Sequence, residues 1–137
     1  MSVLVVQYAE TVLEEKYHKG KKVSNMVDTQ LMKGILEGCV LAIIARGETY
    51  GYEILSLLGD NGFSDLGEGT LYPLLTRLDK NGYISCRKAK SPLGPIRKYY
   101  IITPQGKEYL QQFKESYQII NQNAMKILFE IEGEKIC

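Results

Sequence analysis

Four leucines at helical spacing constrain the fold of this chain more than any other feature. The spacing i, i+3, i+4 and i+7 predicts an α-helix with one apolar face packed on a core. The four residues are Leu71, Leu74, Leu75 and Leu78. Pro73 lies among them, and a proline removes no hydrogen bond only in the first turn of a helix. We therefore expect the helix to begin near Thr70, with the Thr70 hydroxyl as its cap.

The rest of this helix surface is free for a partner. At about 100° per residue, the side opposite the leucines and its flanks hold one proline and several polar or aromatic side chains. These residues are Tyr72, Pro73, Thr76, Arg77 and Lys80.

A β-hairpin is predicted to follow this helix. Asn81-Gly82 ends the helix, and Tyr83–Lys90 and Arg97–Thr103 alternate as strands do. The two prolines of the turn between them, Ser91–Pro95, exclude a central strand there. The hairpin therefore carries a basic tip that projects as a wing.

Two further helices are predicted before the leucine-rich one. The first runs from Asp28 to Ala45 and is apolar nearly all round from Cys39, and a short second helix closes near Gly59. Three helices followed by a hairpin is the order of a winged helix-turn-helix. The predicted fold is thus mainly α with a small β-hairpin: a winged helix domain over residues 26–103, a C-terminal helix over 104–137, and an N-terminal extension over 1–25 that could form a helix.

The C-terminal helix has a coiled-coil seam. Its apolar residues alternate steps of three and four, which is the heptad pattern. They are Leu110, Phe113, Tyr117, Ile120, Ala124, Ile127 and Ile131. A seam of this length needs a second chain to cover it, and a symmetric homodimer supplies one. Phe113 and Tyr117 are then plain dimer core, or they line a ligand cavity if the two domains hold the seam apart.

The distribution of charge favours a polyanion as the partner. The net charge is only +1. However, basic residues crowd the helix end and the hairpin: Arg77, Lys80, Arg87, Lys88, Lys90, Arg97 and Lys98. A helix fits the major groove of DNA, and wing cations can grip phosphates beside it. The alternative is a winged-helix protein-interaction module, with a solvated charged hairpin and no DNA binding.

Other classes of function find little support in the sequence. His18 is the single histidine, and Cys39, Cys86 and Cys137 have no metal-type spacing. No phosphate-binding glycine loop occurs, and no apolar run approaches the roughly 18 residues of a membrane span. We expect a cytoplasmic protein that is not an enzyme and holds no metal or cofactor.

Three motifs together resemble the PadR family of bacterial transcriptional regulators. They are LEGCVLAIIARGETYGYEI at Leu36–Ile54, GTLYPLLTRLDKNGYI at Gly69–Ile84 and RKYYIITPQGKEYL at Arg97–Leu110. The resemblance implies a dimer joined by a single C-terminal helix, mostly repressors, and inverted-repeat operators.

The resemblance also implies site residues. DNA contacts would come from the recognition helix, the wing strand and the head of the second helix: Thr70, Tyr72, Thr76, Arg77, Arg97, Lys98, Tyr99 and the phosphate contact Tyr50. In ligand-sensing relatives an aromatic residue of the dimer helix stacks on flat apolar ligands. The matching position here is Tyr117, so a small aromatic or apolar ligand could release the operator.

Overall fold

The computed structural model describes residues 29–130, so the predicted N-terminal extension and Ile131 lie outside the described residues. The chain divides into two units. One is the domain of residues 29–112, and the described part of the other is the stretch 113–130. Each is described by itself.

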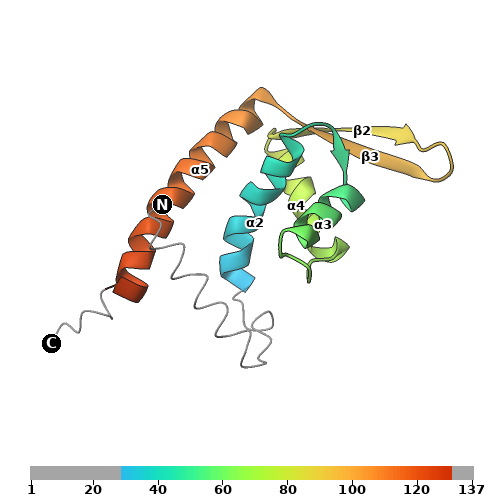
Figure 1. Cartoon of the computed structure of the whole chain (residues 1–137). Coiled ribbons are helices and arrows are strands. Elements are labelled where there is room, and N and C mark those ends of the chain that lie inside the picture. Colours follow the sequence, from blue (N-terminus) through green and yellow to red (C-terminus); the bar gives the residue numbers. More distant parts are fainter. Residues whose placement is uncertain (1–28, 131–137) are drawn as a thin grey trace. The chain divides into compact units, whose positions relative to one another are not determined.

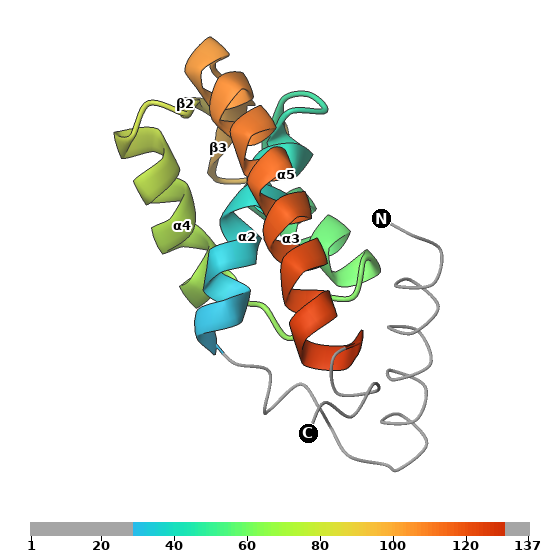
Figure 2. The ribbon, with the colours of Figure 1, turned by 90° about the vertical axis from the view of Figure 1, so that its left-hand side faces the viewer.

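Three helices build the core of the domain, as predicted. They are α2 (Thr29–Ile44), α3 (Gly51–Asp60) and α4 (Glu68–Lys80). Figures 1 and 2 show α2 beside α3 and α4, below the β-hairpin. All four leucines of the α4 stripe are buried, with 0–4% of their surface exposed. Burying each such side chain contributes roughly 2–3 kcal/mol, so the stripe fixes which face of α4 points inward.

Helix α4 begins earlier than predicted. It starts at Glu68 with Gly67 as its N-cap, and no side chain caps it. The backbone N–H of Leu71 already donates to the Gly67 carbonyl, so Pro73 lies inside the helix rather than in its first turn. The prediction of a Thr70 cap was wrong. Helix α4 gains its stability from the buried leucines, so it can lose the one backbone hydrogen bond that Pro73, which has no N–H, cannot donate.

The sheet has three strands rather than the predicted two. Strands β2 (Ile84–Lys90) and β3 (Ile96–Ile102) form the hairpin, and the two-residue strand β1 (Thr49–Tyr50) pairs with β3 to give the antiparallel order β1-β3-β2. Thr49, Tyr100 and Cys86 lie in one cross-strand row, and Tyr50, Tyr99 and Arg87 lie in the next. Because neighbouring residues of a strand point to opposite faces, these two rows face opposite ways. Thr49 and Tyr100 are buried, so the Tyr50 row is on the outer face.

The first turns of α5 (Pro104–Met125) belong to the domain. Thr103 caps the helix, since its Oγ1 accepts a hydrogen bond of 2.9 Å from the backbone N–H of Gly106. The ring of Tyr109 stacks on that of Tyr83 with centroids 4.3 Å apart. Leu110 is buried in the core of its own domain. Most of its surface is therefore already covered within the chain, which leaves little of it for the predicted seam.

The stretch 113–130 continues α5 to Met125 and ends in a π-helix, η2 (Lys126–Glu130). Its apolar side chains are largely uncovered: Tyr117 is 44% exposed, Ile120 66% and Ile127 64%. The π-helix corrects the prediction of one continuous α-helix. Its wider turn advances each residue by a smaller angle, so Ile127 departs from the heptad phase of Ile120.

Candidate nucleic-acid interface

A hollow of about 400 Å³ lies where the N-terminus of α3, helix α4 and strand β3 meet. Its lining comes from these three elements and from the end of β1: Tyr50, Gly51, Tyr52, Tyr72, Ile96, Arg97 and Lys98. Four of these, namely Tyr50, Tyr72, Arg97 and Lys98, are predicted DNA contacts. Residues far apart in the sequence thus converge on one surface, which combines phenol rings with two cations.

Gly51 makes the close approach of α3 and α4 possible at this hollow. A Cβ atom at residue 51 would lie 2.7 Å from the Tyr72 Oη and 3.1 Å from its Cζ. The Tyr72 side chain therefore rests directly on the first turn of α3. Sequence reasoning did not find Gly51 as a site residue, although a glycine opening a helix was the available signal.

The remaining predicted residues of α4 are exposed: Thr70, Thr76, Arg77 and Lys80. The Thr76 hydroxyl donates a hydrogen bond of 2.9 Å to the backbone carbonyl of Tyr72. Its donor is thus used within the helix, and its oxygen can still accept. Arg77 and Lys80 occupy the last turn of α4, where a positive charge is favoured by the helix dipole.

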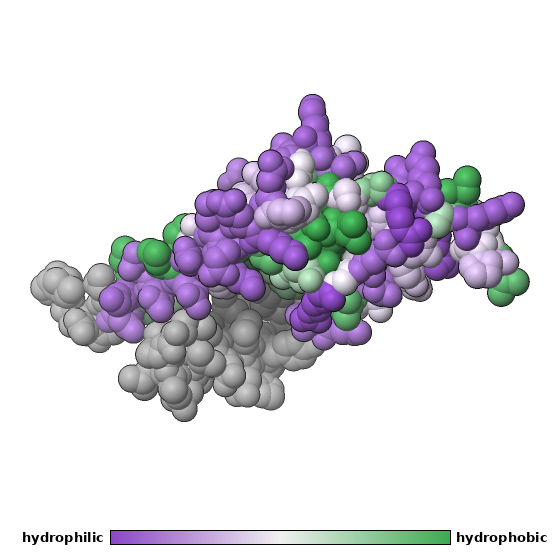
Figure 3. Space-filling view, turned by 90° about the horizontal axis from the view of Figure 1, so that it is seen from above, coloured by the Kyte–Doolittle hydropathy of each residue, from purple (hydrophilic) through white to green (hydrophobic). Residues whose placement is uncertain are grey.

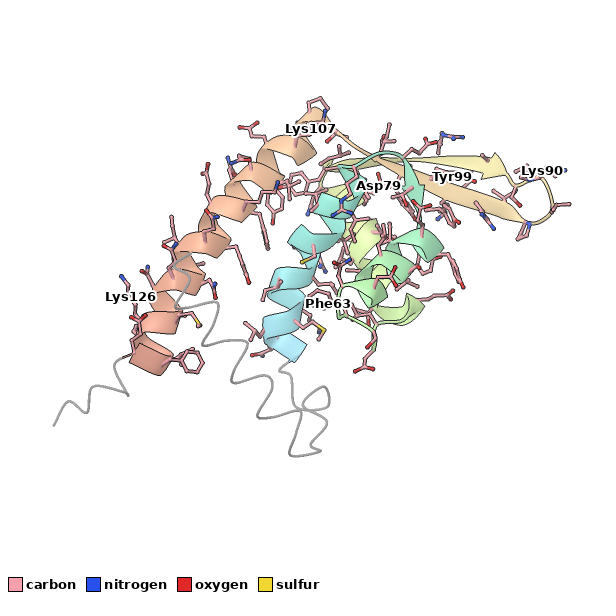
Figure 4. All side chains as sticks on the ribbon, in the orientation of Figure 1. Phe63, Asp79, Lys90, Tyr99, Lys107 and Lys126 are labelled. Atoms are coloured by element: carbon pink, nitrogen blue, oxygen red, sulfur yellow. The ribbon has the colours of Figure 1, made fainter. Side chains whose placement is uncertain are left out.

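The outer face of the sheet carries a continuous stack of aromatic and cationic side chains. The Arg97 guanidinium lies over the Tyr50 ring, 4.7 Å from its centroid. The rings of Tyr50 and Tyr99 meet edge to face at 5.8 Å, and the Arg87 guanidinium lies over Tyr99 at 4.8 Å. This stack joins Tyr99, a predicted contact, to two others. Figure 4 shows Tyr99 in the hairpin and Lys90 near its tip.

Arg87 ends the stack in an ion pair. Its Nε and Nη2 donate hydrogen bonds of 2.7 and 2.6 Å to the two carboxylate oxygens of Glu48. These hydrogen bonds lower the pKa of Glu48 and raise the pKa of Arg87, so both groups stay charged over the physiological range. Sequence reasoning missed this pair because the two residues are 39 positions apart.

The hairpin beyond the stack is basic and ends in apolar side chains. Lys88, Lys90, Arg97 and Lys98 are exposed. Leu93 and Ile96, at the turn, are 101% and 66% exposed. Figure 3, which looks down on the hairpin, shows hydrophilic side chains over most of the visible surface and apolar ones at the tip. A polyanion would therefore meet cations along the length of the wing.

The predicted ligand-binding residues, Phe113 and Tyr117, are outside the domain that carries this surface. Both belong to the helical stretch 113–130, and Phe113 is half-buried. Within residues 29–130, no three His, Cys, Asp or Glu side chains cluster so that they could hold a metal ion. Cys39 and Cys86 are half-buried free thiols, and burial raises the pKa of Cys39. None of the helices in the described part is long and apolar enough to cross a membrane.

Comparison with known proteins assigns the chain to a family. Residues 40–112 match the sequence profile described as "Transcriptional regulator PadR-like family". A PadR-like transcriptional regulator of Bacillus cereus is 44% identical, with a TM-score of 0.65, over 74% of this chain and 98% of that one. A Streptococcus transcriptional regulator is 42% identical, also with a TM-score of 0.65, over 73% and 98% of the two chains.

A relative from Lysinibacillus sphaericus is 33% identical over 94 residues, which are 67% of this chain and 86% of that protein. The matched residues are more than half of the 137, and they run from within α2 to the first turns of α5. The chain therefore belongs to the PadR-like family of transcriptional regulators, which bind DNA and are not enzymes.

Proposed function

We propose that the chain is a homodimeric repressor that occupies a palindromic operator through α4 and the basic wing. The observation that carries the proposal is the hollow between α3, α4 and β3. It brings Tyr50, Tyr72, Arg97 and Lys98 to one surface from three separate elements. Two cations beside phenol hydroxyls match the chemistry of a DNA phosphate and its sugar.

Helix α4 would read bases while the wing holds the backbone. The exposed side chains of Thr70, Thr76 and Arg77 can reach base edges or phosphates when α4 lies in the major groove. Arg97, Lys98 and Lys80 would then contribute phosphate contacts on the flanks. The wing contacts would add affinity without sequence preference, and α4 would supply the preference.

A dimer would match the symmetry of the operator. The stretch 113–130 exposes Tyr117 and Ile120, an apolar surface that a second copy of the helix would cover. Two half-sites about one helical turn apart, ~34 Å, would then receive the two α4 helices. Repression would follow from occupancy of the operator.

A small aromatic or apolar ligand would release the operator. Phe113 and Tyr117 lie one helical turn apart on the same side of α5, so both would border the space between the paired helices. A flat ligand that stacks on Tyr117 would separate the helices and alter the half-site spacing. Even a small rotation there would lower operator affinity.

A salt titration of DNA binding tests the proposal. The full chain is mixed with a labelled duplex taken from upstream of its own gene, and fluorescence anisotropy gives Kd at several salt concentrations. We expect specific binding that weakens steeply with salt, and a log–log slope that falls by about one for Arg97→Ala. Lys33→Ala, which removes an exposed cation of α2 outside the interface, should leave the slope unchanged.

The double variant Tyr72→Ala with Arg97→Ala separates recognition from assembly. It should keep the mass of the wild-type oligomer and lose operator affinity. Failure of the wild-type protein to retard any duplex would overturn the proposal and favour the protein-interaction module. Loss of assembly in the double variant would instead mean that these side chains support the fold.

A further inference from the structure

The stack on the outer face of the sheet links a surface ion pair to a DNA-facing cation. Glu48 comes just before β1, which pairs with β3, and Arg87 lies on β2 at the other side of β3. Their ion pair therefore spans β3 and sits on the same face as Tyr50 and Tyr99. The ion pair lies at one end of the stack, and Arg97 lies at the other end.

We propose that Glu48 and Arg87 are positioning residues for Arg97, which they hold in its DNA-binding conformation through Tyr99 and Tyr50. The proposal rests on the function proposed above and names two further residues that serve it. It has a consequence opposite to simple electrostatics. A carboxylate near the DNA surface would raise, rather than lower, affinity for a polyanion.

The conformational freedom of Arg97 affects how strongly it can bind DNA. An exposed Arg97 would sample many rotamers and would lose that freedom when it bound a phosphate. Its position over the Tyr50 ring restricts it before DNA arrives. The restriction lasts only while Tyr50 keeps its place, and Tyr50 sits in a strand of two residues that makes few backbone bonds of its own.

Tyr50 is held in place by side chains of β2 and β3. The ring of Tyr99 touches it edge to face, and Tyr99 is covered on its own face by Arg87. Arg87 in turn is fixed by the fork geometry of its bond to Glu48, which uses both Nε and Nη2. A bidentate guanidinium–carboxylate pair fixes orientation in a way that a lysine could not.

The geometry also argues that Arg87 is not simply one more phosphate contact. Two of its nitrogens donate hydrogen bonds to Glu48 and its guanidinium carbon lies over the Tyr99 ring, so an approaching phosphate would have to displace the carboxylate. Lys88, the next residue of β2, is exposed and points to the other face. It offers a matched cation outside the stack.

A measurement without DNA tests the stack directly. In the NMR spectrum of the free full-length protein, the side-chain protons of Arg97 should be shifted upfield by the Tyr50 ring. Arg87→Ala and Glu48→Gln should each move these signals toward the values of a free arginine, whereas Lys88→Ala should leave them in place. Unchanged Arg97 signals in Arg87→Ala and Glu48→Gln would overturn the proposal.

Operator affinity separates positioning from simple electrostatics, because the two explanations predict opposite changes in affinity. Glu48→Gln removes a negative charge, so electrostatics alone expects tighter binding, whereas loss of positioning expects binding weaker by about two- to fivefold. Asp65→Asn, at an exposed acid of the loop after α3, removes the same charge outside the stack and should bind slightly more tightly. Tighter binding by Glu48→Gln would overturn the proposal.

The arginine variants complete the test. Arg87→Ala should bind more weakly than Lys88→Ala, and Arg87→Lys should not restore binding, because lysine lacks the fork. Equal effects of Arg87→Ala and Lys88→Ala, with full rescue by Arg87→Lys, would mean that charge alone matters and would overturn the proposal. If the wild-type protein binds no duplex, the proposed function fails, while the NMR signals of Arg97 still decide whether the stack positions it.

Discussion

The hydroxyl oxygen of Tyr72 lies 2.7 Å from the place that a Cβ atom of residue 51 would occupy. Helices α4 and α3 are therefore in contact at a point where a Cβ atom would overlap the Tyr72 ring in its present position. Gly51 is buried and begins α3, next to Tyr50. The position of Tyr72 at the hollow thus depends on the absence of a side chain on a different helix.

Gly51→Ala should weaken operator binding while leaving the fold intact. The added methyl group would push the Tyr72 ring aside, and because that ring is 41% exposed it can rotate away without unfolding the core. We expect a loss of about tenfold in affinity, comparable to the loss of one good side-chain contact. Anisotropy with the operator gives the affinity, and a thermal melt reports the fold.

Gly59→Ala is the matched control for this substitution. Gly59 lies in the same helix, and a Cβ atom there would meet no atom within 4 Å. It should bind DNA as the wild type does and be slightly more stable, because alanine favours a helix. Equal binding by the two variants would show that the position of Tyr72 is unimportant.

Ile120→Glu should give monomers in solution. Ile120 is 66% exposed in the single chain, so the charge should cost the domain little, yet it would be buried without a partner in a paired seam. Light scattering after size exclusion measures the mass. Gln118→Glu, on the opposite side of the helix, should remain a dimer, and an unchanged mass for Ile120→Glu would refute the seam.

Gly106→Ala should destabilise the domain. A Cβ atom at this position would overlap the Tyr83 carbonyl oxygen and lie 2.8 Å from Cγ1 of Ile102. The carbonyl cannot move freely, since it accepts a hydrogen bond of 3.0 Å from the Thr103 backbone N–H. Overpacking of this kind costs about 1–3 kcal/mol or more, which urea unfolding followed by circular dichroism would measure.

The control for Gly106→Ala is Gly34→Ala in α2. No atom lies within 4 Å of the Cβ position of Gly34, so this variant should be as stable as the wild type or about 0.5–1 kcal/mol more stable. Similar unfolding midpoints for both variants would contradict the close packing of α5 on the start of β2.

Alkaline pH should destabilise the domain through Tyr100. Burial raises the pKa of Tyr100 to about 12. An unfolded tyrosine has a pKa of about 10, so the neutral form stabilises the fold fully below pH ~10, and this contribution is lost as pH rises from about 10 through 12. Urea unfolding at pH 9 and pH 11 should show a smaller loss of stability for Tyr100→Phe than for the wild type. Tyr52→Phe, at a site 74% exposed, should lose as much as the wild type, and parallel losses in all three proteins would refute the assignment.

The elements with strong local patterns were predictable from sequence. The leucine stripe of α4, the end of that helix at Asn81-Gly82, and the Thr103 cap of α5 all depend on neighbours within about seven residues. Gly82 has φ +81°, a conformation that favours glycine, and Thr103 Oγ1 accepts a hydrogen bond from the backbone N–H of Gly106, three residues later. Local spacing carries such information because the interactions themselves are local.

The features that sequence reasoning missed depend on distant contacts. Strand β1 has two residues, too few to show alternation, and it exists because β3 is there to pair with it. The start of α4 at Glu68 was misjudged because the energy of the buried leucines outweighed the cost of Pro73 within the helix. Leu110 fitted the heptad pattern equally well as a seam or a core residue, and only packing distinguishes the two.

The amino-acid sequence by itself determined the order of helices and hairpin, the inward face of α4, and the family. Each of these depends on a periodic pattern or on a motif of neighbouring residues. The tertiary structure decided which predicted contacts share a surface. It placed Tyr72 against Gly51, stacked Arg97 on Tyr50, and joined Arg87 to Glu48 across β3. These relationships arise from the close approach of atoms on different elements, and the spacing of residues along the chain does not determine those distances.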